Sequence, residues 1–197
     1  GFNLAEIRNK AIWVSKGEYI IQVDGDLILH PQFIQDHIAL ATPNRFISGS
    51  RILLTEAFSN RILQQGEIPV RAKLLLYGKN RLNGLRVPLL TTLLASSYKA
   101  QQPYYVKGCN MSFWRSDLIA VDGYEAAIKG WGKEDSEIAV RLINKGVKRL
   151  FIKFGGICYH LHHTVADRSM EKDNDDILLY TIESKKSSFF RLFLKLR

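Results

Sequence analysis

The sequence predicts an α/β fold in which helices flank a β-sheet, and three observations lead to it. Apolar residues recur at helical spacing over residues 4–14, and Gly17 follows as a helix end. The next segment, Tyr19–Val23, is short and rich in β-branched and aromatic residues, as expected of a buried strand. A helix that starts at Pro31 and a strand over residues 45–51 then repeat this order.

The alternation is interrupted between residues 53 and 102 and then resumes. This segment is helical in pattern but is broken by glycine and proline, so we expect two or three short helices inserted between strands. Further strands are expected over residues 111–114, 148–154 and 157–160. Further helices are expected over residues 134–145 and 175–184.

Composition limits the class of protein. The 197 residues are 46% apolar and 24% charged, which is typical of one soluble domain. No apolar run is long enough to span a membrane and no signal-peptide pattern begins the chain, so we expect a cytoplasmic protein. Cys109 and Cys158 lie far apart without a CxxC spacing, which indicates reduced thiols, although the sequence leaves a disulfide between them open.

The net charge of +9 is concentrated in two segments. Residues 61–107 hold eight Lys or Arg and one acid, Glu67, while residues 185–197 hold five Lys or Arg and no acid. Such segments favour anionic partners, namely lipid headgroups, phosphates or nucleic acid. The second segment interleaves Phe and Leu with its cations. It therefore predicts either a packed helix whose Lys and Arg reach solvent, or peripheral contact with a membrane.

The motif Asp24-Gly25-Asp26 directly follows the strand expected over Tyr19–Val23. Two carboxylates one residue apart repel each other, so a positive charge is expected between them. A hard divalent cation suits oxygen ligands and usually also holds substrate phosphates, which makes a metal site one interpretation. The alternative is a type I′ turn in a hairpin, since Asp-Gly is a strong hairpin signal.

Glu134 and Asp135 open the helix expected over residues 134–145, directly after Trp131 and Gly132. Acids at a helix N-terminus are stabilised by the helix dipole by about 0.3–1 kcal/mol each, so ordinary charge placement explains them. In the functional alternative, the Trp131 ring stacks on a sugar and a neighbouring carboxylate accepts a hydroxyl proton as a general base.

Three histidines lie within four residues, at positions 160, 162 and 163. Alternation along a strand would place His160 and His162 on one face, where one of them could complete a divalent-metal site that begins at Asp26. Structural histidines are the alternative. A zinc site of Cys158, His160 and His162 is a further one, but the sequence holds no second pair of cysteines.

The stretch Lys107-Gly108-Cys109-Asn110 is a weaker candidate. Gly108 permits close approach of the backbone, and the Asn110 side chain can both donate and accept hydrogen bonds.

Taken in order, these motifs resemble the family 2 glycosyltransferases of the GT-A fold, especially the branch with a C-terminal galactosyltransferase-like module. The resemblance spans about residues 5–163 and implies a GT-A-like mixed sheet flanked by helices. We therefore expect a partial GT-A domain over residues 1–163, a helical basic insertion over residues 52–104 and a helical tail over residues 164–197. The family's opening strands, which hold the base and ribose of the donor, have no counterpart, so the domain is expected to be N-terminally truncated.

The resemblance also implies residue roles. Asp24 and Asp26 match the DxD motif, with Asp26 the direct ligand of Mn²⁺ or Mg²⁺ and Asp24 nearer the ribose or sugar of the donor. His160, or alternatively His162, would complete the metal site. Asp135 matches the catalytic base, with Glu134 beside it binding hydroxyl groups. The residues implied in donor or acceptor binding are Arg8, Asp24, Asn110, Trp131 and Gly132.

The implied reaction is inverting transfer from a nucleotide sugar, with UDP as the nucleotide, to a glycan or a lipid-linked glycan at the inner face of the cell membrane. The alternatives are a catalytically inactive fragment, a peripheral membrane or scaffold protein, and a basic nucleic-acid-binding module. We expect no nucleic-acid partner, since the carboxylates of the DxD motif and of residues 134 and 135 would repel phosphate. An exposed sheet edge left by the truncation predicts self-association into a homo-oligomer.

Overall fold

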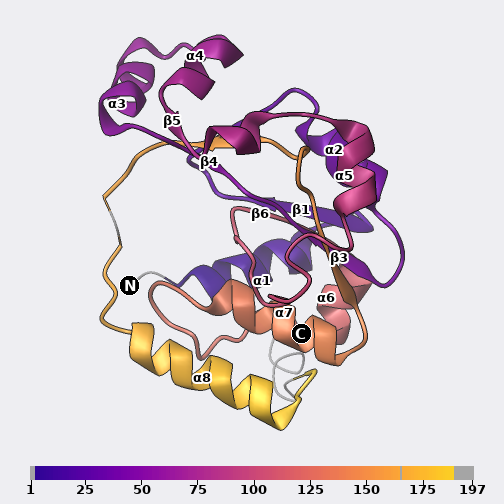
Figure 1. The fold of residues 1–197 in the computed structure, drawn as a ribbon. Coiled ribbons are helices and arrows are strands. Elements are labelled where there is room, and N and C mark those ends of the chain that lie inside the picture. Colours follow the sequence, from indigo (N-terminus) through magenta and orange to yellow (C-terminus); the bar gives the residue numbers. More distant parts are fainter. Residues whose placement is uncertain (1–2, 165, 189–197) are drawn as a thin grey trace.

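The computed structural model describes residues 3–164 and 166–188. Within these ranges the strands form two four-stranded sheets with helices packed around them (Figure 1). The predicted α/β class, with mixed sheets flanked by helices, is therefore confirmed. The division of the strands between two sheets was not evident from the sequence.

The first sheet has the strand order β1–β6–β3–β7. Its strands are Tyr19–Val23 (β1), Asn110–Trp114 (β6), Arg45–Ser48 (β3) and Lys148–Phe151 (β7). Both β1 and β3 run antiparallel to β6, whereas β7 runs parallel to β3, so the sheet is mixed. Four of the five residues of β6 are buried, which fits its central position between two neighbours.

The second sheet has the order β2–β8–β4–β5. Its strands are Leu27–Leu29 (β2), Cys158–His160 (β8), Ile52–Leu54 (β4) and Gly78–Lys79 (β5). Because β1 pairs with β6 and β2 pairs with β8, the hairpin interpretation of Asp24-Gly25-Asp26 is wrong. These three residues instead carry the chain from one sheet to the other.

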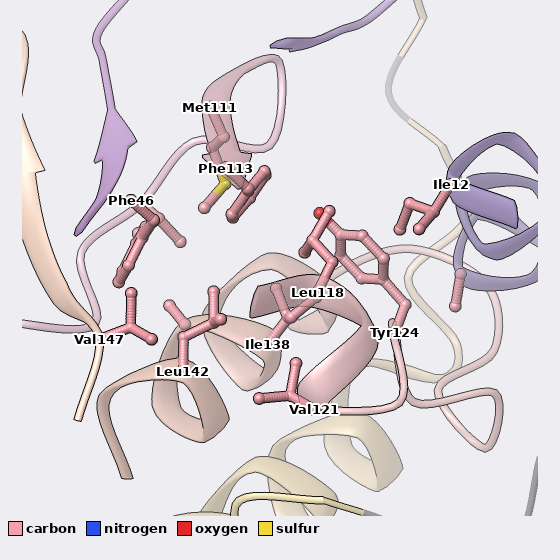
Figure 2. Packing of buried hydrophobic residues seen from close by; sticks show 13 residues of the cluster. Ile12, Phe46, Met111, Phe113, Leu118, Val121, Tyr124, Ile138, Leu142 and Val147 are labelled. Atoms are coloured by element: carbon pink, nitrogen blue, oxygen red, sulfur yellow. The ribbon is translucent and has the colours of Figure 1, made fainter. Parts of the chain in front are cut away.

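Three helices cover the first sheet and complete the main core. They are Leu4–Val14 (α1), Arg115–Ala120 (α6) and Glu134–Asn144 (α7), of which α6 was not predicted from the sequence. Figure 2 shows Ile138 and Leu142 of α7 together with Phe46 and Phe113 of the sheet. All four of these side chains are fully buried. Burial of this kind fixes the orientation of α7, and with it the position of its N-terminus.

A buried ion pair within α7 is hydrogen-bonded to the last described helix, Glu171–Ser184 (α8). The Arg141 guanidinium donates to both oxygens of the Glu137 carboxylate, at 2.7 and 2.6 Å, and also to the carbonyl of Val121. The Thr181 hydroxyl of α8 donates to Glu137 at 3.2 Å. Since both charged side chains are wholly buried, removal of either one would leave an unpaired charge in the interior.

The inserted segment covers the second sheet with its first two helices, while the end of its third helix, at Ala95, packs with Ile47 and Leu150 of the first sheet. Its helices are Glu56–Gln65 (α3), Arg71–Leu76 (α4) and Pro88–Leu94 (α5), with a 3₁₀ turn at Arg81–Gly84 (η1) between them. This confirms the prediction of short helices between residues 53 and 102. Phe58, Ile62 and Leu74 pack against Ile52 and Tyr159 of the sheet.

The two sheets meet at the buried side chain of Asn110. Its amide nitrogen donates to the carbonyls of Ser50 and Gly156, both at 2.8 Å. Its amide oxygen lies 3.0 Å from Nε2 of His37, a buried residue of the helix Phe33–Leu40 (α2). Gly49 lacks the Cβ that would lie 2.4 Å from this amide. Asn110 therefore holds the junction between the sheets, and this geometry does not support its expected contact with substrate.

Several predicted boundaries differ from those observed. The strand expected over residues 148–154 ends at Phe151, and Phe154 adopts a left-handed backbone conformation with φ 63°. Helix α8 starts at Glu171, four residues before the expected position. Residues 189–197 of the predicted basic tail lie outside the described residues. In the described part of the chain, no helix has the length and apolar character needed to cross a membrane.

Candidate active site

A cleft of about 1440 Å³ lies between the two sheets. Residues of α1 and β1 line it together with the β1–β2 connection, β4 and the start of α7. Pockets for a single small ligand typically measure about 300–1,000 Å³, so this cleft has room for two substrates. Two groups of polar side chains face it, one at the edge of the second sheet and the other around α1 and the start of α7.

The first group consists of Asp26, His160 and His163, whose candidate ligand atoms all lie within 4.8 Å of one another. Nε2 of His160 is 3.4 Å from Oδ2 of Asp26, and Nε2 of His163 is 3.1 Å from the same oxygen. Asp26 precedes β2 and His160 ends β8, and these two strands are paired neighbours. The pairing of the second sheet therefore creates this cluster.

The donor atoms of this cluster fit a divalent cation. Nδ1 of His160 lies 2.8 Å from the carbonyl of Leu161, and Nδ1 of His163 lies 2.8 Å from that of Thr164. A proton on Nδ1 satisfies each of these contacts and leaves the Nε2 lone pair directed at Asp26. Burial lowers the pKa of His160, which favours this neutral ring. Lone pairs facing a carboxylate repel it unless a cation lies between them, and the backbone contact is the usual outer partner of a metal-bound imidazole.

The environment of Oδ1 of Asp26 also fits a bound cation. It is buried and has no hydrogen-bond partner within the described residues. A buried carboxylate oxygen without a partner is costly, and a bound cation would satisfy it. One carboxylate with two imidazoles suits Mn²⁺ better than Mg²⁺, because Mg²⁺ is bound mainly by oxygen ligands.

The structure places His163, and not the expected His162, beside His160. The chain leaves β8 at His160, so the alternation of side chains along a strand does not extend to His162. The backbone N–H of His162 donates to Ser59 at 2.8 Å, and its ring is not part of the cluster. His163 takes the third position. The three histidines in the sequence indicated this segment. Which of them faces Asp26 depends on where strand β8 ends, and this was not evident from the sequence.

The second group is centred on the buried guanidinium of Arg8 in α1. Nη1 lies 2.6 Å from Asp135 and 3.0 Å from Glu134, and Nη2 lies 3.4 Å from Asp24. Three predicted site residues are thus joined through a fourth. Asp24 belongs to this group and not to the cluster of Asp26 with the two histidines.

Asp135 is held from two sides. Its Oδ1 accepts the hydrogen bond from Arg8, and its Oδ2 accepts one from the backbone N–H of Gly108 at 2.7 Å. A Cβ at position 108 would lie 2.1 Å from Oδ1 of Asp135, so only glycine allows this approach. With its side chain 22% exposed, Asp135 still faces the cleft.

Trp131 and Gly132 also line the cleft, as predicted. The Arg168 guanidinium lies over the Trp131 ring at 4.4 Å from its centre, a contact that sequence reasoning missed. The Asn174 amide of α8 donates to the carbonyls of both residues, at 3.3 and 3.1 Å. Helix α8 therefore fixes the loop that leads into α7.

Glu134 titrates near neutral pH. It is 6% exposed, and burial followed by the charge of Asp135 raises its pKa to about 7, against the opposing effect of Arg8. A raised folded-state pKa means that the group contributes its full stability below its ordinary value of 4.5. That contribution is lost as the pH rises to the folded value.

Changing Glu134 to Gln should remove this pH dependence. The quantity to compare is the difference in free energy of unfolding between the unmodified protein and E134Q. We expect this difference to fall by about 2–3 kcal/mol as the pH rises from 4.5 to 7. Urea unfolding of both proteins across this range measures the difference. The exposed Glu183→Gln on α8 is the matched control and should give a flat difference. A flat difference for E134Q as well would contradict the assignment.

A comparison with known protein families matches part of the chain to a glycosyltransferase domain. A family model described as the N-terminal domain of galactosyltransferase matches residues 91–164, which include Gly108, Trp131, Asp135 and both clustered histidines. The chain therefore contains a segment similar to a galactosyltransferase domain, within a GT-A-like α/β fold, as the resemblance in the sequence implied. No curated protein matches the chain.

Two solved structures are similar over most of this chain. A mycobacterial protein is 14% identical, with 94% of this chain and 52% of the other covered at a TM-score of 0.45. Glucosyl-3-phosphoglycerate synthase from Mycobacterium tuberculosis, in complex with phosphoglyceric acid, is 12% identical, with 98% and 60% covered at a TM-score of 0.42. The chain thus spans between about half and three-fifths of the length of these two proteins.

Proposed function

We propose that the chain forms the catalytic site of a metal-dependent, inverting glycosyltransferase. It would move a sugar from a nucleotide donor, with UDP as the nucleotide, to a hydroxyl of a glycan or a lipid-linked glycan. One observation carries the proposal. A cluster that fits a divalent cation and a carboxylate fixed at the start of a helix face the same cleft.

The donor would bind on the side of the second sheet. Asp26, His160 and His163 would hold Mn²⁺, which when bound neutralises the charge of the leaving diphosphate. Arg8 holds Asp24 beside this cluster, where a carboxylate can accept hydrogen bonds from ribose or sugar hydroxyls.

The acceptor would bind on the side of α7. Asp135 accepts the proton of the attacking hydroxyl while that oxygen forms a bond to the anomeric carbon and the bond from this carbon to the donor phosphate breaks. A single displacement of this kind inverts the anomeric configuration. Arg8 and the N–H of Gly108 each occupy one lone pair on an Asp135 oxygen, so each oxygen retains a second lone pair for the proton. Glu134 would orient acceptor hydroxyls, and the Trp131 ring offers a face on which a sugar can stack.

A catalytically inactive domain is the alternative function. Self-association also stays a prediction. β1 is an edge strand of the first sheet and its Val23 is 41% exposed, so a second chain could pair there.

Isothermal titration with Mn²⁺ and then UDP tests whether the donor site forms. We expect UDP to bind the unmodified chain only after Mn²⁺ has been added, and this binding to be lost in Asp26→Ala. Asp167→Ala, an exposed acid outside both groups, is the matched control and should bind as the unmodified chain does. UDP binding that needs neither Mn²⁺ nor Asp26 would overturn the proposed metal site. Mn²⁺ binding without UDP binding would favour the inactive alternative.

A further inference from the structure

Large apolar side chains that face solvent are concentrated in one part of the described chain. Of the 20 exposed large hydrophobic residues, 11 lie between residues 63 and 93. They are Leu63, Ile68, Val70, Leu76, Tyr77, Leu82, Leu85, Val87, Leu89, Leu90 and Leu93. Scattered apolar residues are normal on protein surfaces, but a concentration of this kind marks an interaction site.

Helix α5 shows that this exposure is built into the local structure. The polar Thr91 is its buried residue, while Leu89 and Leu93 are 71% and 64% exposed. The inward and outward sides of this helix therefore have the reverse of the usual polarity. The loop between α3 and α4 has the same character, since Ile68 and Val70 are 70% and 67% exposed.

Positive charge accompanies these apolar residues. No acid occurs between Glu67 and Asp117 in the sequence. Within the described residues, Arg86 forms an ion pair with Asp36, at 2.6 Å, but no acid lies within ion-pair distance of Arg61 or Lys73. We call the exposed apolar and basic residues from 61 to 93 the basic–apolar surface.

Two contacts hold parts of this segment in place. The Arg71 guanidinium of α4 donates to the carbonyl of Gly84 in η1, and Arg86 ties the following residues to Asp36 of α2. Figure 1 shows α3 and α4 at the end of the molecule away from α8, and α5 beside α2. The surface also borders the cleft, because Lys79 is among the residues that line the cleft.

We propose that the basic–apolar surface docks the chain on an anionic lipid bilayer. Exposed Leu and Ile side chains enter the boundary between headgroups and acyl chains, and Arg and Lys around them meet anionic headgroups. A second copy of this chain would bring two basic surfaces together, which like charges oppose. Nucleic acid would attract the cations but would leave the aliphatic side chains without partners.

Docking in this way would place the proposed reaction at a membrane surface. The docking itself does not depend on the proposed function. The cleft would open beside the bilayer, where a lipid-linked acceptor has its hydroxyl groups close to the membrane. Binding of the membrane is measured without any transfer reaction, so the two proposals can fail separately.

Flotation of the full chain with lipid vesicles tests the proposal. We expect binding to vesicles of phosphatidylcholine with phosphatidylserine and little binding to phosphatidylcholine alone. Replacing Ile68, Leu82 and Leu89 by Ser should weaken binding by at least about ten-fold, because each loses burial of an aliphatic side chain. Replacing Arg61 and Lys73 by Gln should also weaken it by about ten-fold, because both cations act near an anionic surface.

Matched variants elsewhere on the molecule act as controls. Val14 and Leu179 are 74% and 54% exposed, and changing both to Ser should leave vesicle binding unchanged. Changing Lys10 in α1 and Lys16 just after it to Gln should also leave vesicle binding unchanged. Circular dichroism and cooperative thermal unfolding of each variant show that it is folded.

Three outcomes would overturn the proposal. Vesicle binding that persists in the Ser variant would mean that the apolar residues take no part. Binding lost only when Phe189, Phe190 and Phe193 are changed to Ser would assign it to the C-terminal segment instead. Binding of the chain to polyuridylate, weakened by the Gln variant but not by the Ser variant, together with no vesicle binding, would assign the surface to nucleic acid.

Discussion

Replacing Asp135 by Asn is expected to lower the rate of sugar transfer by about 10²–10⁴-fold, the usual contribution of a general base. Asn keeps the size of the side chain and can still accept one hydrogen bond, but its amide cannot take a proton from the acceptor hydroxyl. The loss should appear in kcat, with Mn²⁺-dependent UDP binding unchanged. Transfer from UDP-sugars at saturating acceptor measures the first quantity and titration measures the second.

Gly108 provides a second way to test the same carboxylate. Ala at this position would place a Cβ 2.1 Å from Oδ1 of Asp135, so the carboxylate must move although its chemistry is intact. We expect G108A to slow transfer as well. Gly17→Ala, where the nearest atom to the new Cβ is 3.5 Å away, is the matched control and should transfer at the unmodified rate. Normal transfer by D135N would exclude Asp135 as the base.

Replacing His163 by Ala is expected to weaken Mn²⁺ binding by at least about ten-fold, whereas His162→Ala should leave it unchanged. His163 directs Nε2 at Asp26 from 3.1 Å, while the ring of His162 lies outside this cluster. Since substitution of groups that merely support a metal ligand already costs about 10–100-fold in affinity, loss of a direct ligand should cost at least as much. Titration of Mn²⁺ into both variants measures the difference.

His162→Ala is a suitable control for His163→Ala because the two residues are adjacent in the sequence and both are exposed to solvent. Equal loss of affinity in both variants would indicate a general effect on the segment after β8. Loss in H162A alone would restore the pairing of His160 with His162 that strand alternation predicts.

The short elements of the fold were largely predictable, because periodicity and Gly or Pro positions act locally. Tyr19–Val23 was identified to the residue, and the breaks at glycine and proline correctly divided the inserted segment into short helices. The division into two sheets was not predictable, since the pairing of β1 with β6 joins segments about 90 positions apart and no local pattern records it.

The candidate site shows the same limit. Asp26, Asp135 and the histidine run were recognised by residue type and order, but their grouping depends on tertiary packing. Arg8 had been matched to donor binding and in fact joins three carboxylates, and Asn110 bonds the two sheets together instead of facing the cleft. His163 was missed because strand alternation was extended two residues beyond the end of β8, to His162.

The junction at Asn110 gives the chain a way to tune reactivity from a distance. Asp26 and His160 belong to the second sheet, while the α7 helix that carries Asp135 packs on the first. The spacing between the cluster of Asp26 with the two histidines and the Asp135 carboxylate therefore depends on how the two sheets are joined, to which the Asn110 amide and the His37 ring contribute. A small tilt of one sheet would alter the alignment of the two reacting molecules while every side chain in the cleft stayed the same. Evolution of specificity in such a module can thus proceed through buried residues that never touch a substrate.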